Sequence, residues 1–204
     1  MNYSKIAFSD ASKRFQERYG SRASYARLEG RFTSGLTENE LKYIGDQDHF
    51  YMASIGENGF PYIQFRGGPK GFLKVINDHQ LGFIDFRGNQ QYVSVGNFTT
   101  NNKTALILLD QAARARLKIY AEAEILEISE NSDLYDLLNL PSYKFRGERI
   151  IRLNVKAYDW NCPQHITPRY TLDEIEQKFS AQNEIIQKLR LENQELKAKL
   201  APSR

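Results

Sequence analysis

The stretch RLKIYAEAEI, residues 116–125, alternates between polar and apolar side chains at every step. Successive side chains of an extended strand point to opposite faces, so a period of two separates a buried face from a solvated one. Leu117 and every second residue after it would face a core, whereas Arg116 and Lys118 would face outward. The stretch therefore predicts a half-buried β-strand, and residues 149–158 repeat the pattern.

Shorter apolar runs between turn signals predict the rest of a sheet. They occupy residues 50–55, 61–66, 81–86, 92–95 and 105–109. The Asn58-Gly59 pair after the first run is a hairpin signal. The strands follow one another in hairpin-like succession, and no βαβ spacing is present. The pattern predicts a mainly β fold, namely a closed or nearly closed antiparallel β-barrel with peripheral helices.

Three short helices are expected around the barrel. One covers residues 9–19, and a second follows Thr37, which forms a capping box with Glu40. The third covers residues 132–138 and is ended by a proline. Residues 20–36 are rich in Gly, Ser and Arg and are expected to be irregular surface chain.

The C-terminal part of the chain has a different periodicity, which begins after a second capping box at Thr171 and Glu174. Its seam residues recur at alternating steps of three and four: Leu172, Ile175, Phe179, Gln182, Ile186, Leu189, Asn193, Leu196 and Leu200. This is a heptad seam, and a polar Asn193 at the heptad position of Phe179 and Ile186 commonly fixes register and a two-stranded state. The pattern predicts a C-terminal coiled-coil-like helix, which either pairs with itself or packs on its own domain.

The pattern divides the chain into three parts. An N-terminal helix and irregular arm cover residues 1–36, the barrel domain covers 37–170, and the C-terminal helix covers 171–204. The formal net charge of +3, without a concentrated basic stripe, argues against a nucleic-acid binder. Residues 1–10 lack the apolar core of a secretory signal, and no stretch approaches the roughly 18 apolar residues of a membrane span. With a single cysteine, Cys162, the chain is expected to be soluble and cytoplasmic.

Polar side chains gather on the barrel strands. Gln64 and Arg66 share one strand face, either as two solvated side chains or with Arg66 paired to a phosphate, which its planar fork suits. Arg116 and Lys118 form a second cationic row, and the two rows could hold a dianion if the barrel brings them together. A dense group of donors follows around two predicted strands: Asp85, Arg87, Asn89, Gln91, Tyr92, Ser94 and Asn97. This density favours a binding role.

Other chemistry has little support. The glycine-rich residues 67–71 lack the Gly-Lys-Ser/Thr ending of a nucleotide-triphosphate loop. Cys162 and His165 have no second ligand pair, so no metal site is predicted. The segment 159–170 holds the only tryptophan and two prolines, and it is either a rigid linker or an arm that reaches across a dimer.

Together these motifs resemble the pyridoxamine 5′-phosphate oxidase-like FMN-binding split-barrel family, with its predicted flavin-nucleotide-binding proteins as the nearest branch. The resemblance covers roughly residues 10–170. It rests on residues 59–71, 83–97, 101–103, 116–119 and 160–170, of which the last is the most specific.

The resemblance implies a homodimer with FMN bound at the subunit interface. Trp160 and the Gln164–Arg169 arm would come from the partner subunit. Placed by position, the residues implied to bind FMN are Gln64, Phe65, Arg66, Gly67, Asp85, Phe86, Asn89, Gln91, Tyr92, Ser94, Arg116, Lys118, Trp160, Gln164, His165 and Arg169.

The implied function is that of an FMN-dependent oxidoreductase whose substrate, electron donor and catalytic residues are not identified by the sequence. Vitamin B6 oxidases carry an Arg-x-Val-Leu-Leu-Lys-like strand where this chain has Gln64 to Gly68, and they pair arginine and histidine more closely than His165 and Arg169. Oxidation of pyridoxamine phosphate is therefore not implied. The alternatives are a non-catalytic flavin carrier or sensor, or a flavin-free barrel that recruits a partner through its C-terminal helix.

Overall fold

The computed structural model describes residues 1–200, with the side chains of Lys178 and residues 198–200 outside the described set. The side chain of Leu200, the last residue of the heptad seam, therefore lies outside the described part. Within residues 1–200, no helix is long and apolar enough to cross a membrane.

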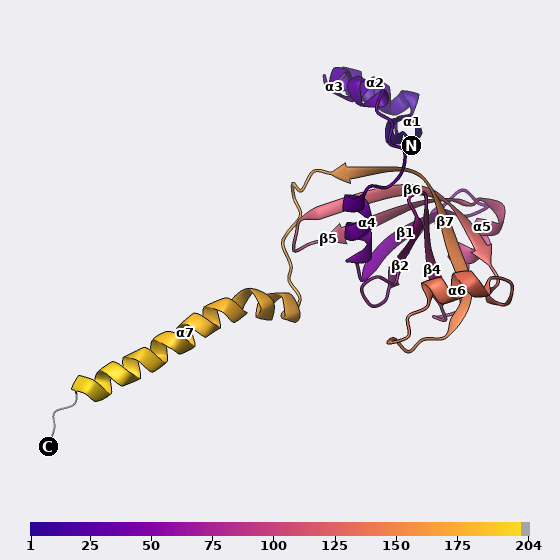
Figure 1. The fold of residues 1–204 in the computed structure, drawn as a ribbon. Helices are drawn as coiled ribbons and strands as arrows, with labels where there is room; N and C mark the ends of the chain where they lie inside the picture. Colours follow the sequence, from indigo (N-terminus) through magenta and orange to yellow (C-terminus); the bar gives the residue numbers. More distant parts are fainter. Residues whose placement is uncertain (201–204) are drawn as a thin grey trace. The chain divides into compact units, whose positions relative to one another are not determined.

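One antiparallel sheet forms the body of the molecule (Figure 1). Its strands are β1 (His49–Ile55), β2 (Pro61–Gly67), β3 (Lys74–Asn77), β4 (Gln80–Phe86), β5 (Lys103–Asp110), β6 (Ala115–Leu126) and β7 (Gly147–Asn161). They are hydrogen-bonded in the order β2-β1-β5-β6-β7-β4-β3. The mainly β fold with peripheral helices is confirmed. In the described residues, however, the sheet is not closed, because β2 and β3 remain its two edges.

The long central strands follow the alternation that the sequence predicts. Leu117, Ile119, Ala121 and Ala123 of β6 are buried, and the intervening side chains are not. Their neighbours in the core include Phe50 of β1. Because these apolar side chains gather on one face of the sheet, their burial supplies the main driving force for this fold.

The described residues also form helices. They are α1 (Tyr3–Ala7), α2 (Asp10–Arg18), α3 (Arg22–Glu29), α4 (Glu38–Gly45), α5 (Val93–Thr100), the 3-10 turn η1 (Ile128–Glu130), α6 (Ser132–Leu138) and α7 (Leu172–Leu200). The predictions of α2, α4 and α6 are confirmed. Thr37 and Glu40 form the expected capping box at the start of α4. The expectation that residues 20–36 are irregular is wrong for α3, since the glycines of this stretch lie outside the helix and its Ala, Arg, Leu and Glu residues favour helical backbone.

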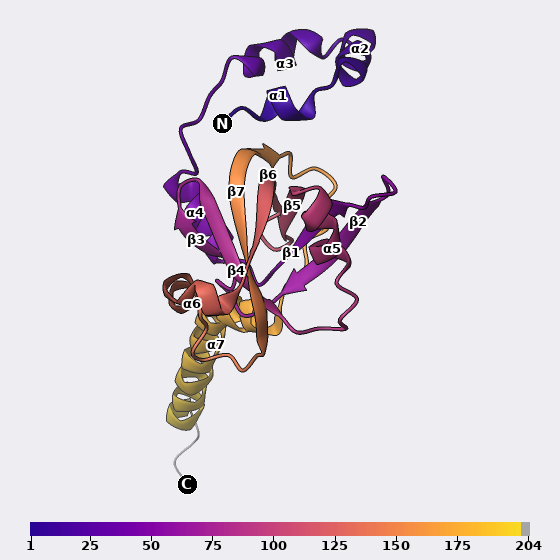
Figure 2. The ribbon, with the colours of Figure 1, turned by 90° about the vertical axis from the view of Figure 1, so that its right-hand side faces the viewer.

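The predicted strand at residues 92–95 is wrong, because α5 begins there. Tyr92 has a φ of 53°, a left-handed conformation that ends extended chain, and helical backbone follows from Val93. Ser94 and Phe98 are the buried residues of α5, and their spacing of four puts them on one helical face. The β-branched Val93 and Val95 made the run look extended. Figure 2 shows α5 beside β1 and β2.

The chain separates into two compact units. The first comprises residues 1–110 and 115–164, and the second comprises residues 111–114 and 165–204. The second unit contains α7, a helix of 29 residues. Its start is capped as predicted, since Thr171 Oγ1 accepts from the Glu174 backbone and Glu174 Oε2 accepts from the Thr171 backbone at 2.8 Å.

Candidate functional site

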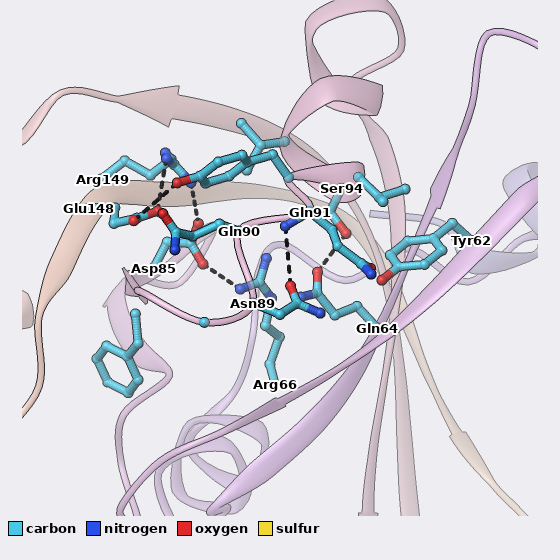
Figure 3. Close-up of a pocket in the computed structure, with 15 residues that line it drawn as sticks. Tyr62, Gln64, Arg66, Asp85, Asn89, Gln90, Gln91, Ser94, Glu148 and Arg149 are labelled. Atoms are coloured by element: carbon cyan, nitrogen blue, oxygen red, sulfur yellow. Dashed lines mark hydrogen bonds and ion pairs between the residues drawn. The ribbon is translucent and has the colours of Figure 1, made fainter.

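A cavity of about 260 Å³ lies between β2, β4, α5 and the start of β7 (Figure 3). Eight of the residues expected to bind a cofactor line it: Gln64, Arg66, Asp85, Phe86, Asn89, Gln91, Tyr92 and Ser94. The fold thus brings together side chains from two strands and a loop that are apart in the sequence. Tyr62, Glu148 and Arg149 also line the cavity and were not expected there.

β2 places its polar side chains toward the cavity. Gln64 and Arg66 lie on the face that adjoins the core, opposite Met52 and Phe50 of β1. The Arg66 side chain is only 13% exposed. The alternative of two fully solvated side chains is therefore wrong for Arg66.

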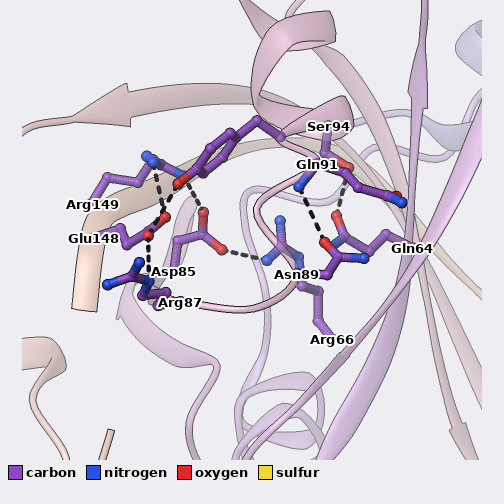
Figure 4. A network of polar contacts seen from close by, with 10 residues as sticks. Gln64, Arg66, Asp85, Arg87, Asn89, Gln91, Ser94, Glu148 and Arg149 are labelled. Carbon is purple, nitrogen blue, oxygen red and sulfur yellow. Dashed lines mark hydrogen bonds and ion pairs between the residues drawn. The ribbon is translucent and has the colours of Figure 1, made fainter. Parts of the chain in front are cut away.

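An ion pair joins β2 to β4 where no backbone ladder does. Arg66 Nη1 donates to Asp85 Oδ1, although β2 and β4 are not neighbours in the sheet. Arg149, which faces Asp85 across the β4–β7 ladder, donates from Nη1 to Asp85 Oδ2 at 2.8 Å (Figure 4). With its side chain 5% exposed, Asp85 holds two guanidinium groups in a place that water barely reaches.

The network continues away from Asp85 through Glu148. Arg149 Nη2 donates to Glu148 Oε2 at 3.1 Å, and Arg87 Nε lies 3.8 Å from Glu148 Oε1. Tyr92 donates its hydroxyl to Glu148 Oε1 at 3.2 Å. The described network contains three guanidinium groups and two carboxylates, so one positive charge remains in formal excess.

The loop before α5 is held in an unusual conformation. Gln90 and Tyr92 have φ angles of 61° and 53°. Residues other than glycine adopt such a backbone conformation at a cost of about 1–3 kcal/mol. The Gln91 backbone donates to Asn89 Oδ1 at 3.2 Å, and Ser94 Oγ donates to Gln64 Oε1 at 2.8 Å. These bonds fix the start of α5 against β2.

The start of α5 offers donors to the cavity. Tyr92 occupies the N-cap position without a capping side-chain bond, and Val93, Ser94 and Val95 line the cavity. The first backbone N–H groups of a helix have no partner within the helix, and the helix dipole makes this end favourable for anions. Arg66 Nε is also buried without a partner among the described atoms. The corner thus has unused hydrogen-bond donors and a positive excess.

Two residues of β2 that were expected at the cofactor do not line the cavity. Phe65 faces the other side of the sheet, where its ring lies 5.7 Å from that of Tyr51 and 5.5 Å from that of His49. Gly67 ends β2 opposite His49.

The second cationic row lies on that same outer side. The cross-strand register runs from Phe65 through Tyr51 and Ile107 to Lys118. Within one chain, therefore, the row of Arg116 and Lys118 is not brought together with Gln64 and Arg66, which face the opposite side.

Both cations of this row have partners in their own chain. Lys118 Nζ donates to Tyr3 Oη at 2.6 Å and lies 3.3 Å from Asp159 Oδ2. Burial lowers the pKa of Lys118, but the hydrogen bond and charge of Tyr3 and the charge of Asp159 outweigh it, so the pKa lies above its ordinary value. Arg116 donates to the backbone oxygen of Cys162 at 2.9 Å.

Trp160 is anchored within its own chain. Its Nε1 donates to Glu40 Oε1 at 2.6 Å, and its ring meets that of Tyr43 edge-on at 4.7 Å. Burial raises the pKa of Glu40, but bonds from Thr37 and Trp160 outweigh burial and hold the pKa below its ordinary value.

The remaining expected residues follow Trp160 in sequence. Gln164 is the last residue of the first unit, and its backbone donates to Cys162 Sγ at 3.5 Å. His165 and Arg169 belong to the second unit. Their role toward a ligand stays a prediction.

The central ion pair left signals in the sequence. Asp85 stands in an apolar strand, and a buried carboxylate requires a cation. Arg149 opens the alternating run of β7 and supplies that cation. The pairing of β4 with β7, which are more than sixty residues apart, is what the sequence does not reveal.

No protein-family model matches the chain, and no curated protein matches it. Solved structures do resemble it. HupZ from Group A Streptococcus matches with a TM-score of 0.48 and 13% identity over 66% of this chain and 99% of that chain. An FMN-binding protein from Syntrophomonas wolfei matches with a TM-score of 0.47 and 14% identity over 72% of this chain and 97% of that chain.

A third similar structure is a Clostridium acetobutylicum protein related to general stress protein 26, described as of the pyridoxinephosphate oxidase family. It has a TM-score of 0.46 and 17% identity over 66% of this chain and 92% of that chain. The description of this third structure names the family that the sequence motifs resemble. Because the TM-scores are below 0.5 and the identities below 25%, we assign no ligand and no residue role from them.

Proposed function

We propose that this chain is an FMN-binding flavoprotein that acts as a homodimer. The observation that carries the proposal is the cavity between β2, β4 and α5, where arginines and the uncapped start of a helix surround a small polar space. A phosphate ester combines the negative charge and the several acceptor oxygens that such a corner can satisfy.

The phosphate end of the flavin fits this corner best. The backbone N–H groups at Val93 to Val95, the hydroxyl of Ser94 and the unpaired Arg66 Nε are the available donors. Asp85 keeps Arg66 and Arg149 in place, and the amides of Gln64 and Gln91 suit the hydroxyls of a ribityl chain. The volume of about 260 Å³ is below the roughly 300–1,000 Å³ of pockets that enclose a whole ligand. Another surface must therefore cover the ring.

A second copy of the chain is the proposed source of that surface. The outer face of β2 and β1 exposes Ile63, Phe65, Tyr51 and Ile55 side by side, with Ile63 at 67% and Phe65 at 59% exposure. A contiguous apolar face of this kind marks an interaction site. Arg116 and Lys118 lie on the same outer side of the sheet.

When bound, the flavin supplies hydride or electron transfer, and the chain supplies position and shielding. The chain binds the phosphate, orients the ribityl chain through its amides and hydroxyls, and excludes water where the partner covers the ring. Both carboxylates that line the cavity, Asp85 and Glu148, are ion-paired to arginines. Neither is free to act as a general base. The second candidate is a flavin carrier or sensor without a substrate of its own.

Calorimetric titration of the purified chain with FMN, riboflavin and inorganic phosphate tests the proposal. We expect FMN to bind at least tenfold more tightly than riboflavin, because the phosphate corner contributes only to FMN. Equal affinity for FMN and riboflavin would contradict the assigned phosphate position, and no binding of either would refute the flavin proposal. Anaerobic addition of NADH or NADPH to the loaded protein then separates an oxidoreductase, whose colour bleaches, from a carrier, whose colour persists.

A further inference from the structure

The helix α7 carries an apolar stripe that is exposed in the single chain. Ile186, Leu189 and Leu196 are all exposed, with Leu189 at 58%. Their heptad spacing places them on one narrow face of a helix of 29 residues. A free stripe of this length costs solubility, so it is expected to be covered by a partner of matching shape.

The C-terminal half of α7 has the heptad pattern of a two-stranded coiled coil. Written as a heptad, Ile186 and Asn193 occupy the a positions, while Leu189 and Leu196 occupy the d positions. An Ile at a with Leu at d favours two parallel strands, and one Asn at an a position fixes register by pairing with its own copy.

The flanking residues distinguish the two possible directions of pairing. In a parallel pair, a g position faces the e position five residues later on the other helix. Glu192 then meets Lys197 of the second copy, and Ile185 lies against the aliphatic stem of Arg190. In the best antiparallel register, Ile185 would instead lie near Glu192, which leaves an exposed apolar side chain beside a carboxylate.

From these positions we infer that α7 pairs with α7 of a second copy as a parallel, in-register, two-stranded coiled coil. A parallel pair has its two-fold axis along the helices, so this contact and a barrel contact can share one axis within a single dimer. An antiparallel pair has its two-fold axis perpendicular to the helices. The inference does not depend on flavin binding.

Disulfide trapping in the full-length chain tests the direction of pairing. In a Cys162→Ser background, Leu196→Cys places the only thiol at a d position. Parallel pairing puts the two thiols opposite each other, so mild oxidation should convert most of the protein to a covalent dimer on a non-reducing gel. Glu184→Cys, on the outer f position, is the matched control and should stay monomeric on the gel.

Two results would overturn the inference. If Leu196→Cys alone does not cross-link but the double variant Phe179→Cys with Leu196→Cys does, the helices are antiparallel, because that register sets residue 179 against 196. If Glu184→Cys cross-links as fully as Leu196→Cys, or if none of the variants cross-links, α7 does not form a specific pair. FMN titration of the same variants reports separately on the proposed function.

Discussion

The two faces of β2 are built in opposite ways. Toward the core, Gln64 and Arg66 are held by Ser94 and Asp85. Toward solvent, Ile63 and Phe65 are exposed. In an ordinary edge strand the apolar residues would face the core and the polar ones the water. Under the proposed function, β2 serves two recognition surfaces at once: a polar one for an anionic ligand and an apolar one for another protein surface.

The largest effect is expected from Arg66→Ala on the polar face. The change leaves the buried Asp85 with Arg149 as its only cation, which should lower the free energy of unfolding by about 2–5 kcal/mol. The same change should weaken FMN binding about 10- to 100-fold, because a charge-assisted hydrogen bond is worth about 1.5–3 kcal/mol. Urea denaturation and calorimetry measure the two quantities.

Arg87→Ala is the matched control, since its side chain is 36% exposed and reaches Glu148 only at 3.8 Å. It should change both quantities far less. Equal losses of stability and FMN affinity in the two variants would show that Arg66 has no special role on the polar face.

On the apolar face, Phe65→Asp should break the barrel contact. Burial of a Phe side chain contributes about 1.5–3 kcal/mol per subunit, and a carboxylate adds a desolvation cost. The change is made together with Leu189→Asp, so that α7 cannot hold the copies together. We expect a monomer by sedimentation, whereas Leu189→Asp alone remains a dimer.

The control for this variant is Leu137→Asp on α6, an exposed apolar residue away from the outer face of β2. With Leu189→Asp it should remain dimeric. If Phe65→Asp with Leu189→Asp also stays dimeric, the apolar face of β2 is not the interface.

A smaller effect is expected at Trp160 of β7, a strand that is not hydrogen-bonded to β2. Trp160→Phe keeps an aromatic ring against Tyr43 but removes the donor to Glu40. The change should lower the free energy of unfolding by about 1.5 kcal/mol, the low end for a hydrogen bond to a charged group. The low end applies because Glu40 keeps its hydrogen bond from Thr37. FMN affinity should change less than twofold. A loss above tenfold would instead place the indole at the ligand.

The smallest effect concerns the pH dependence that Glu40 contributes. Because the folded-state pKa of Glu40 is depressed, its contribution to stability is present above the ordinary value of 4.5 and is lost as the pH falls through the folded-state pKa. As the pH falls below about 5, Glu40→Gln should therefore lose about 1 kcal/mol less stability than the unmodified chain. Urea midpoints measured at neutral pH and below pH 5 give the difference, and an equal loss in both chains would contradict this role of Glu40.

The periodicity of apolar residues and the helix-capping residues predicted much of the fold. β6 and β7 are long and alternate over most of their length, so the strands and most of their buried faces were predictable, although Ile150 and Ile151 of β7 are both buried. The start of α5 was not, because Val93 and Val95 favour strands while the left-handed Tyr92 ends one. β3 has only four residues and carries no clear pattern.

The candidate site was predictable in composition but not in geometry. The donors of residues 85–94 and the pair Gln64 and Arg66 stood out by type, and the fold brings them to one cavity. Arg149 was missed because only the pairing of β4 with β7 puts it beside Asp85. The alternation of β6 predicted that Lys118 faces outward, but only the cross-strand register shows that Gln64 and Arg66 lie on the opposite face.

The ion pair between Arg66 and Asp85 has a consequence for how a ligand enters. Side chains alone link β2 to β4 here, so parting them breaks no main-chain ladder. Rotation of the Arg66 and Asp85 side chains can therefore make room for a ligand while every strand keeps its backbone hydrogen bonds. Because the Arg66 and Asp85 side chains are only 13% and 5% exposed, salt screens their attraction weakly, and opening of this corner should depend little on ionic strength.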